Sequence, residues 1–269
     1  MNIIILSDYF KNSGLGNYLR SQYLYSYLKK KKQISIDFHI LSNTKKNDKK
    51  YNIIIFDLPI YNYDIKSIVS KFAKKKFKII ALDYIFKYKI DCNISIYKKS
   101  NFAKKNFVGL EYSIIRKEFI NKKIKINKNL FFISIGSSDI LNIKKKIKKV
   151  FSKHFSTIFT NSNLTKKKNF SSQENYIKKM ASCKMAASNG GTTMLELLFL
   201  KKTVFVYPQN HFELKFSKYV KKKGFPIFIN KFNINKKEIF DNKNKKNLLI
   251  DQFGVDRICN IIRAYLNNN

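Results

Sequence analysis

One glycine pair in this chain has the setting of an anion-binding turn. Gly190 and Gly191 follow an apolar, strand-like run and precede a helical pattern. Without a Cβ, such a turn lets backbone N–H groups approach a phosphate closely. Thr192 and Thr193 suit a helix start, which favours negative charge, and Glu196 lies one helical turn further on. The pattern predicts a phosphate cradle with a carboxylate near ribose hydroxyls; the alternative is an ordinary strand–helix turn.

The remaining glycines strengthen this interpretation. The chain holds only 8 glycines. Three more of them, Gly14, Gly16 and Gly136, also stand just after expected strands. Ligands of open parallel sheets bind beyond the carboxyl ends of the strands. Glycine retained at these positions in a glycine-poor chain indicates a backbone requirement at a binding site.

Single acidic residues close several expected strands, at Asp8, Asp57, Asp83 and Asp139. Each could equally be a polar strand end or a helix cap. Asp8 and Asp139 are the better site candidates because each flanks a glycine turn. His211 also follows an expected strand and is a candidate ligand contact.

Three other polar residues fit structural roles. His39 lies inside an expected strand, and His154 lies in a lysine-rich stretch where we expect it to be exposed. Arg116 stands out in a chain whose positive charge is mostly lysine. We expect it to form an ion pair with Glu118 or Glu111; the functional alternative is that it fixes a hinge between two domains.

Apolar runs and helical patterns alternate along the chain, which favours a doubly wound α/β fold. Strands are expected at 2–6, 34–41, 52–56, 77–82, 93–97, 130–135, 157–160, 184–188, 203–207 and 226–229. A Lys/Asn/Ile stretch near 121–129 lacks a core pattern and reads as a link. The sequence therefore predicts two Rossmann-like domains, 1–124 and 125–269, facing a cleft. The last helix, about 251–266, could pack back on the first domain.

The charge of the chain is extreme. Lys+Arg number 55 against 17 Asp+Glu, a formal net charge of +38. Such a balance can indicate nucleic acid or an anionic membrane. Here the lysines are scattered in short runs, and Lys, Asn, Ile, Phe and Tyr are all abundant, a pattern typical of AT-rich coding. We expect no dedicated nucleic-acid partner, and contact of the basic surface with a membrane stays open.

The cysteines do not suggest chemistry. Cys92, Cys183 and Cys259 lie far apart, without the spacing of a disulfide framework or a zinc site. The apolar run at the N-terminus is too short for a signal sequence, and no stretch has the length of a membrane-spanning helix. We expect a cytoplasmic protein without a metal or cofactor; the oligomeric state is not predicted.

Several motifs occur in the order found in one known family. They are Ser7-Asp8 with Gly14-Leu15-Gly16, Gly109–Phe119 in the form G-x-x-Y-x-x-(I/L)-R-x-E-F, Phe132–Asp139 in the form F-x-x-x-G-G-(S/T)-D with Ser137 for the second glycine, Ser188–Glu196 in the form S-x-G-G-(S/T)-T-x-x-E, Asn210-His211, and Gly254–Ile258. In this order the chain resembles the UDP-2,4-diacetamido-2,4,6-trideoxy-β-L-altropyranose hydrolases of the pseudaminic acid pathway. That family has the glycosyltransferase-B fold and is similar to the peptidoglycan N-acetylglucosaminyltransferase.

The resemblance implies a UDP-sugar in the cleft between the domains. It implies UDP-binding roles for Gly136, Ser137, Gly190, Gly191, Thr192, Glu196, Asn210 and His211. Glu196 would contact the ribose, and Gly190, Gly191 and Thr192 would contact the diphosphate. Gly14, Gly16 and the residue after them would face the anomeric carbon. The implied function is release of UDP from a UDP-linked diacetamido-trideoxyhexose for nonulosonic acid synthesis.

The chain departs from the family at one catalytic position. Asn17 replaces the histidine that follows the first glycine turn. An asparagine can orient a hydroxyl but cannot accept its proton. Three outcomes stay open: Asp8 or Asp83 acts as the base, the sugar passes to another acceptor as in a glycosyltransferase, or activity has decayed while binding survives.

Overall fold

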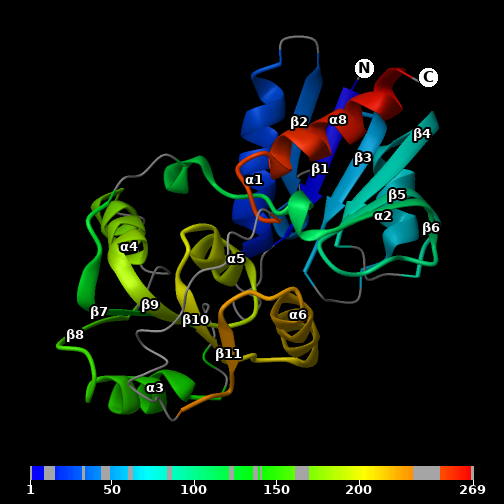
Figure 1. Ribbon diagram of the computed structural model, residues 1–269. Helices are drawn as coiled ribbons and strands as arrows, with labels where there is room; N and C mark the ends of the chain where they lie inside the picture. The colour runs from blue at the N-terminus through cyan, green and yellow to red at the C-terminus, as the bar shows by residue number, and fades with distance from the viewer. Residues whose placement is uncertain are drawn as a thin grey trace. The chain divides into compact units, whose positions relative to one another are not determined.

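The computed structural model describes residues 2–8, 16–31, 34–43, 49–59, 63–83, 87–120, 124–135, 139, 141–160, 170–232 and 249–267. They divide into two compact α/β units (Figure 1). The first comprises Met1–Ile114 and Asp251–Asn269, and the second comprises Ile115–Ile250. The chain therefore first passes from one unit to the other between Ile114 and Ile115, whereas the sequence alone placed the boundary at 124/125.

The first unit is built on a six-stranded sheet in the order β2-β1-β3-β4-β5-β6, with every neighbouring pair parallel. The strands are β1 (Asn2–Ser7), β2 (Ser35–Ile40), β3 (Tyr51–Asp57), β4 (Ala73–Leu82), β5 (Ile90–Ser95) and β6 (Ala103–Val108). The helices are α1 (Gly16–Lys29), α2 (Ile65–Phe72) and α8 (Gly254–Asn267), with short 3-10 turns η1 (Leu41–Asn43) and η2 (Leu110–Tyr112). Continuous apolar runs such as that of β1 suit strands covered on both faces.

Both faces of this sheet are covered by helices. Because side chains alternate along a strand, Ile3 and Ile5 pack with α1 and α8, while Ile4 and Leu6 pack with α2. Gly254 starts α8 against the backbone of η2: a Cβ there would lie 2.0 Å from the carbonyl oxygen of Ser113. The last helix thus belongs to the core of the first unit.

The second unit is built on a five-stranded parallel sheet in the order β11-β10-β9-β7-β8. The strands are β7 (Asn127–Ser134), β8 (Thr157–Thr160), β9 (Cys183–Ser188), β10 (Thr203–Val206) and β11 (Ile227–Ile229). The helices are α3 (Ile143–Phe151), α4 (Phe170–Ser182), α5 (Thr192–Phe199) and α6 (His211–Lys222), with a 3-10 turn η3 (Lys117–Phe119). None of the helices in the described part of the chain is long and apolar enough to cross a membrane.

Aromatic packing forms much of the second core. The rings of Phe131 on β7 and Phe151 on α3 stack with centroids 3.9 Å apart, and Phe205 on β10 meets Phe151 edge-on at 4.9 Å. On the sheet, Ser134 pairs in register with Ser188, and Ser188 with Val206. Since the strands are parallel, their carboxyl ends form one edge, from which the glycine turn leaves.

Candidate functional site

The predicted glycine turn is present as a short link between β9 and α5. Gly191 is the N-cap of α5 with φ −106° and ψ −157°, and no side chain within the described part of the chain caps the helix. The Gly191 N–H donates to the carbonyl oxygen of Asn189 at 2.7 Å. The first turn of a helix has N–H groups without intrahelical partners and carries partial positive charge. An uncapped start of this kind suits a phosphate.

The two glycines have different reasons to be glycine. A Cβ at Gly190 would lie 2.5 Å from the carbonyl oxygen of Glu213 and 2.4 Å from the Ser217 hydroxyl, both on α6. At Gly191 the nearest atom would be the Asn189 side chain at 3.6 Å, an ordinary contact. Packing alone therefore explains Gly190, whereas a Cβ at Gly191 would make only ordinary contacts.

Glu213 holds the turn to the next loop. Its Oε1 accepts from the Asn189 side-chain amide at 2.6 Å, and its Oε2 accepts from the Gln209 N–H at 2.7 Å. Burial raises the pKa of Glu213, and these two hydrogen bonds partly offset the shift. The loops after β9 and β10 are thus joined by one carboxylate, a role that our sequence reasoning missed. The spacing of Asn210 and Glu213 was an available signal, since it follows the N-cap–x–x–Glu pattern of a helix start.

Asn210 and His211 begin α6 at the same sheet edge. The Asn210 side chain accepts from the Glu213 N–H at 2.9 Å and caps the helix. His211 is exposed. The described structure thus brings Gly190, Gly191, Thr192, Asn210 and His211 to the ends of neighbouring strands, and their contact with a ligand stays a prediction. Gly136 and Ser137 lie outside the described residues.

Glu196 is buried, with a residue exposure of 3 %. Its carboxylate accepts two hydrogen bonds from Arg116: Nε to Oε1 at 2.5 Å and Nη2 to Oε2 at 2.9 Å. The expectation that Arg116 pairs with Glu118 or Glu111 is wrong. Burial by itself would lower the pKa of Arg116, but Glu196 more than offsets this and raises it.

A buried polar cluster surrounds this ion pair. The Tyr176 and Ser134 hydroxyls lie 3.1 Å apart. Burial and the Glu196 charge raise the pKa of Tyr176, while hydrogen bonds to Ser134 and Thr193 oppose the shift. The Ser188 hydroxyl, on the register partner of Ser134, is buried and has no hydrogen-bond partner among the described residues. Polar groups are thus concentrated where β7 and β9 end.

In the first unit, the two proposed catalytic residues lie at the carboxyl edge of the sheet. Asp8 follows β1, is 2 % exposed, and accepts from Ser42 Oγ at 2.7 Å and the Tyr63 hydroxyl at 3.2 Å. Gly16 and Asn17 are the first two residues of α1 and are half-buried. Gly14 lies outside the described residues.

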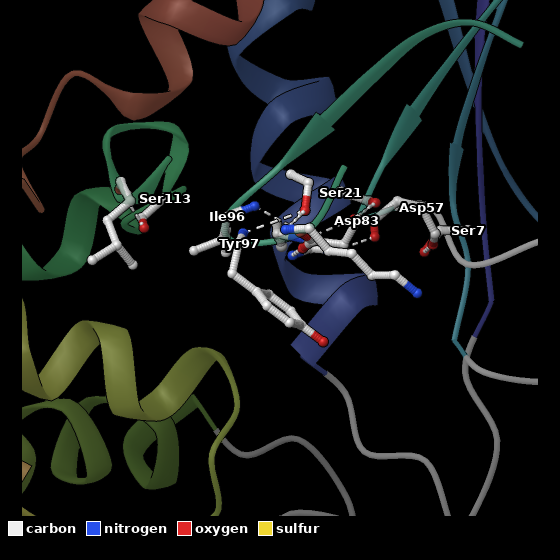
Figure 2. A network of polar contacts seen from close by, with 11 residues as sticks. Ser7, Ser21, Asp57, Asp83, Ile96, Tyr97 and Ser113 are labelled. Carbon is white, nitrogen blue, oxygen red and sulfur yellow. Dashed lines mark hydrogen bonds and ion pairs between the residues drawn. The ribbon is translucent and has the colours of Figure 1, made fainter. Parts of the chain in front are cut away.

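Asp57 and Asp83 belong to a buried network around Arg20 of α1, shown in Figure 2. Asp57 accepts from Arg20 Nε at 3.0 Å and also from its Nη2, while Asp83 Oδ2 accepts from Arg20 Nη1 at 2.6 Å. Ser21 Oγ adds a hydrogen bond of 2.6 Å to Asp57. Burial alone would lower the pKa of Arg20, but the two carboxylates more than offset it and raise it.

Asp83 is held from its other side too. Its Oδ1 accepts from the Ile96 N–H at 3.0 Å, and its own backbone has φ +51°, in the left-handed region. A side chain bonded to Arg20 through one oxygen and to the backbone through the other serves as an anchor. Sequence reasoning missed Arg20, although it stands one helical turn after Asn17.

Other candidates have structural roles. Asp139, expected in the site, caps α3 by accepting from the Ile143 and Lys144 N–H groups at 2.8 and 2.9 Å. His39 lies on the edge strand β2 and packs against Phe72 with ring centroids 6.0 Å apart. His154 is exposed just after α3, as expected. No group of three or more His, Cys, Asp or Glu residues that could hold a metal occurs within the described residues.

The comparisons with known proteins bear on the fold. No protein-family model matches this chain, and no curated protein matches it. Among solved structures, the crystal structure of Acinetobacter baumannii MurG matches with a TM-score of 0.55 at 7% identity, covering 98% of this chain and 99% of that one. At this identity the likeness shows the fold alone. The expected glycosyltransferase-B fold of two Rossmann-like domains is confirmed.

Proposed function

We propose that this protein is a glycosyltransferase that takes its sugar from a UDP-sugar, with the diphosphate at the N-terminus of α5. The observation that carries the proposal is the helix start at Gly191, which no side chain of the described residues caps and where a Cβ would make only ordinary contacts with Asn189. The loop is held by Glu213, so its N–H groups are oriented before a ligand arrives. Such preorganised donors stabilise the charge of a leaving diphosphate.

The reaction needs few groups from the protein. An acceptor hydroxyl oxygen forms a bond to the anomeric carbon while the bond from that carbon to the diphosphate oxygen breaks. The nucleotide leaves with the electron pair, and the hydroxyl proton passes to a base or to solvent. Helix N–H groups at the diphosphate would favour the departure of UDP.

Transfer and hydrolysis differ only in the acceptor. In transfer a sugar or lipid-linked hydroxyl attacks the anomeric carbon, and in hydrolysis water attacks it. Both reactions release a proton from the attacking hydroxyl, so the absence of a histidine at Asn17 does not separate them. The structural neighbour MurG is a glycosyltransferase, and this supports transfer. The second candidate is the UDP-sugar hydrolase of the pseudaminic acid type, supported by the order of the sequence motifs. A sugar-nucleotide-binding protein without activity is the third.

The test is to incubate the protein with a panel of UDP-sugars and follow UDP release with and without acceptors. We expect release that depends on an acceptor. Release in water alone would favour the hydrolase, and saturable UDP binding without release would favour the binding protein. If calorimetry detects no binding of UDP at all, the proposed function is wrong.

One variant separates the two enzymes further. Asn17→His introduces an imidazole that can accept a proton at neutral pH. If the chain retains a hydrolase site, we expect UDP release in water to rise about 10²–10⁴-fold, the usual contribution of a general base. Asn260→His, at an exposed position on α8, is the matched control and should change nothing. An unchanged rate in Asn17→His would argue against hydrolase chemistry.

A further inference from the structure

The first sheet ends on a strand with one neighbour. β6 pairs with β5, and no other strand of the described part of the chain adds to it (Figure 1). An edge strand presents backbone N–H and C=O groups with which another extended chain can pair. The Gly109 N–H donates to the Ser95 carbonyl oxygen at 3.0 Å, so the alternation of the backbone turns Phe107 toward β5 and turns Asn106 and Val108 away from it.

A hollow of about 340 Å³ lies beside this edge, between β6 and α8. Its volume falls in the range of ligand-binding pockets, about 300–1,000 Å³. Most of the side chains that line it are apolar and in part exposed to solvent. The lining consists of Lys105, Phe107, Asn260, Ile261, Ala264 and Tyr265. An extended chain added to β6 would therefore have room on this face of the sheet for its own apolar side chains.

The walls of the hollow are held in place by the first unit itself. The rings of Phe107 and Tyr112 meet edge-on with centroids 6.3 Å apart. On α8, the Tyr265 hydroxyl donates to the Asp91 carbonyl oxygen at 3.3 Å, and Ile261, one helical turn earlier, packs against the core of the unit. The hollow is thus formed before anything binds, which lowers the entropic cost of binding.

Charge restricts what can dock at this edge. The Lys104 ammonium donates to Asp91 Oδ1 at 2.9 Å, whereas the neighbouring Lys105 is exposed and has no ion-pair partner among the described residues. A second copy of this chain would bring the same two lysines of both copies together, and each copy carries a net charge of +38. Like charges across neighbouring strands are destabilising, whereas an acidic side chain opposite Lys105 is favourable.

We propose that β6 and the hollow beside it form a docking site for an extended, acidic segment of a partner protein, which adds to the first sheet as an edge strand. Its backbone pairs with that of Asn106 and Val108, its apolar side chains enter the hollow, and a carboxylate meets Lys105. Lysines on an edge strand also protect against unspecific pairing, but that role does not account for an apolar hollow beside the strand. This inference is independent of the proposed function, because it concerns a different face of the chain.

The experiment measures binding of a fluorescent peptide of alternating glutamate and valine to the full chain by anisotropy, at about 0.15 M salt to screen unspecific attraction. Lys105→Glu replaces an attractive pair by a repulsive one, and we expect binding to weaken about threefold to thirtyfold. Lys145→Glu changes the net charge equally at an exposed position on α3. This matched control should bind the peptide almost as the unaltered protein does.

Two further measurements test the hollow and the backbone pairing. Ala264→Phe places a ring in the hollow without a change of charge and should weaken binding about tenfold, whereas Ala264→Ser leaves the hollow open and should not. Both positions on α8 and β6 are exposed, and thermal unfolding checks that each variant folds. In the complex, the Asn106 and Val108 amides should gain protection from hydrogen exchange, while the Phe107 amide, which faces β5, changes little.

The outcomes decide the proposal. It is supported if Lys105→Glu and Ala264→Phe weaken binding, their controls do not, and a peptide N-methylated at every second residue loses at least about tenfold in affinity. It is overturned if the peptide does not bind below about 1 mM, or if Lys105→Glu and Lys145→Glu bind it equally. Equal binding of the N-methylated peptide, or unchanged exchange at Asn106 and Val108, also overturns it, because the contact is then one of charge alone.

Discussion

The phosphate site at α5 can be tested by placing a competing charge at its centre. Gly191 is the N-cap of α5, its φ and ψ are extended, and the nearest atom to a Cβ there would be the Asn189 side chain at 3.6 Å. Aspartate is a favoured N-cap residue, so Gly191→Asp should fold normally. Its carboxylate would occupy the helix start where a phosphate is proposed to bind.

The size of the effect follows from Coulomb's law. Replacing a glycine N-cap by aspartate changes helix stability by only ~0.3 kcal/mol. Two like charges about 4 Å apart repel by about 4 kcal/mol at an effective dielectric constant of 20. That energy corresponds to a loss of UDP affinity of about 10²–10³-fold. Gly191→Asn caps the helix with a similar shape and no charge, and should cost about tenfold or less.

The assay combines calorimetric titration with UDP and thermal unfolding of the same samples. The difference between the aspartate and asparagine variants should shrink as salt is added, because salt screens exposed charges. If Gly191→Asp binds UDP as tightly as the unaltered protein, phosphate does not bind at the start of α5. If both variants lose binding equally, the loss arises from the shape of the side chain and not from charge.

Three other predictions concern the supports of the two sheet edges. Gly190→Ala should destabilise the fold by about 1–3 kcal/mol, measured by urea unfolding, because its Cβ would meet the carbonyl oxygen of Glu213 at 2.5 Å; unchanged stability would contradict this packing. Arg20→Met should cost about 3–5 kcal/mol in the same assay, since it leaves the fully buried Asp57 without its positive partner; a loss below 1 kcal/mol would show that the network is dispensable. Burial raises the pKa of Glu213, so the folded protein binds the carboxyl proton more tightly than the unfolded chain does. As the pH rises from the pKa of the unfolded state through the higher pKa of the folded state, this carboxyl therefore lowers the stability progressively. Glu213→Gln should remove that pH-dependent loss, and an identical pH profile for the two proteins would refute it.

Sequence patterns predict most of this fold because its central strands are buried on both faces. The apolar runs of β1, β3, β7, β9 and β10 each mark a strand. Strand β6 was missed because it lies at the sheet edge, where lysines are common and the apolar signal is weak. The glycine turn could also be predicted, because its signal is local: two adjacent glycines between an apolar run and a helical pattern.

The ion-pair partners of the two arginines could not be predicted from the sequence. Arg116 was assigned to acidic residues two or five positions away, yet its partner Glu196 is 80 positions along the chain. Arg20 and Asp57 are 37 positions apart. Neighbours in sequence are natural first guesses for an ion pair, but the parallel sheet brings distant strand ends to one edge. Such pairing follows from topology and not from spacing.

The two buried arginines have a common consequence for the helices beside them. A buried ion pair adds little net stability, because desolvation offsets most of the attraction, so stability alone does not account for its presence. What the pair does supply is geometry, since a guanidinium bonded at two points admits few orientations. In the first unit Arg20 fixes α1 one turn after Asn17, and in the second Arg116 fixes α5 through Glu196, one turn after Thr192. In each unit a buried arginine therefore sets the helix start from which the proposed contacts are made.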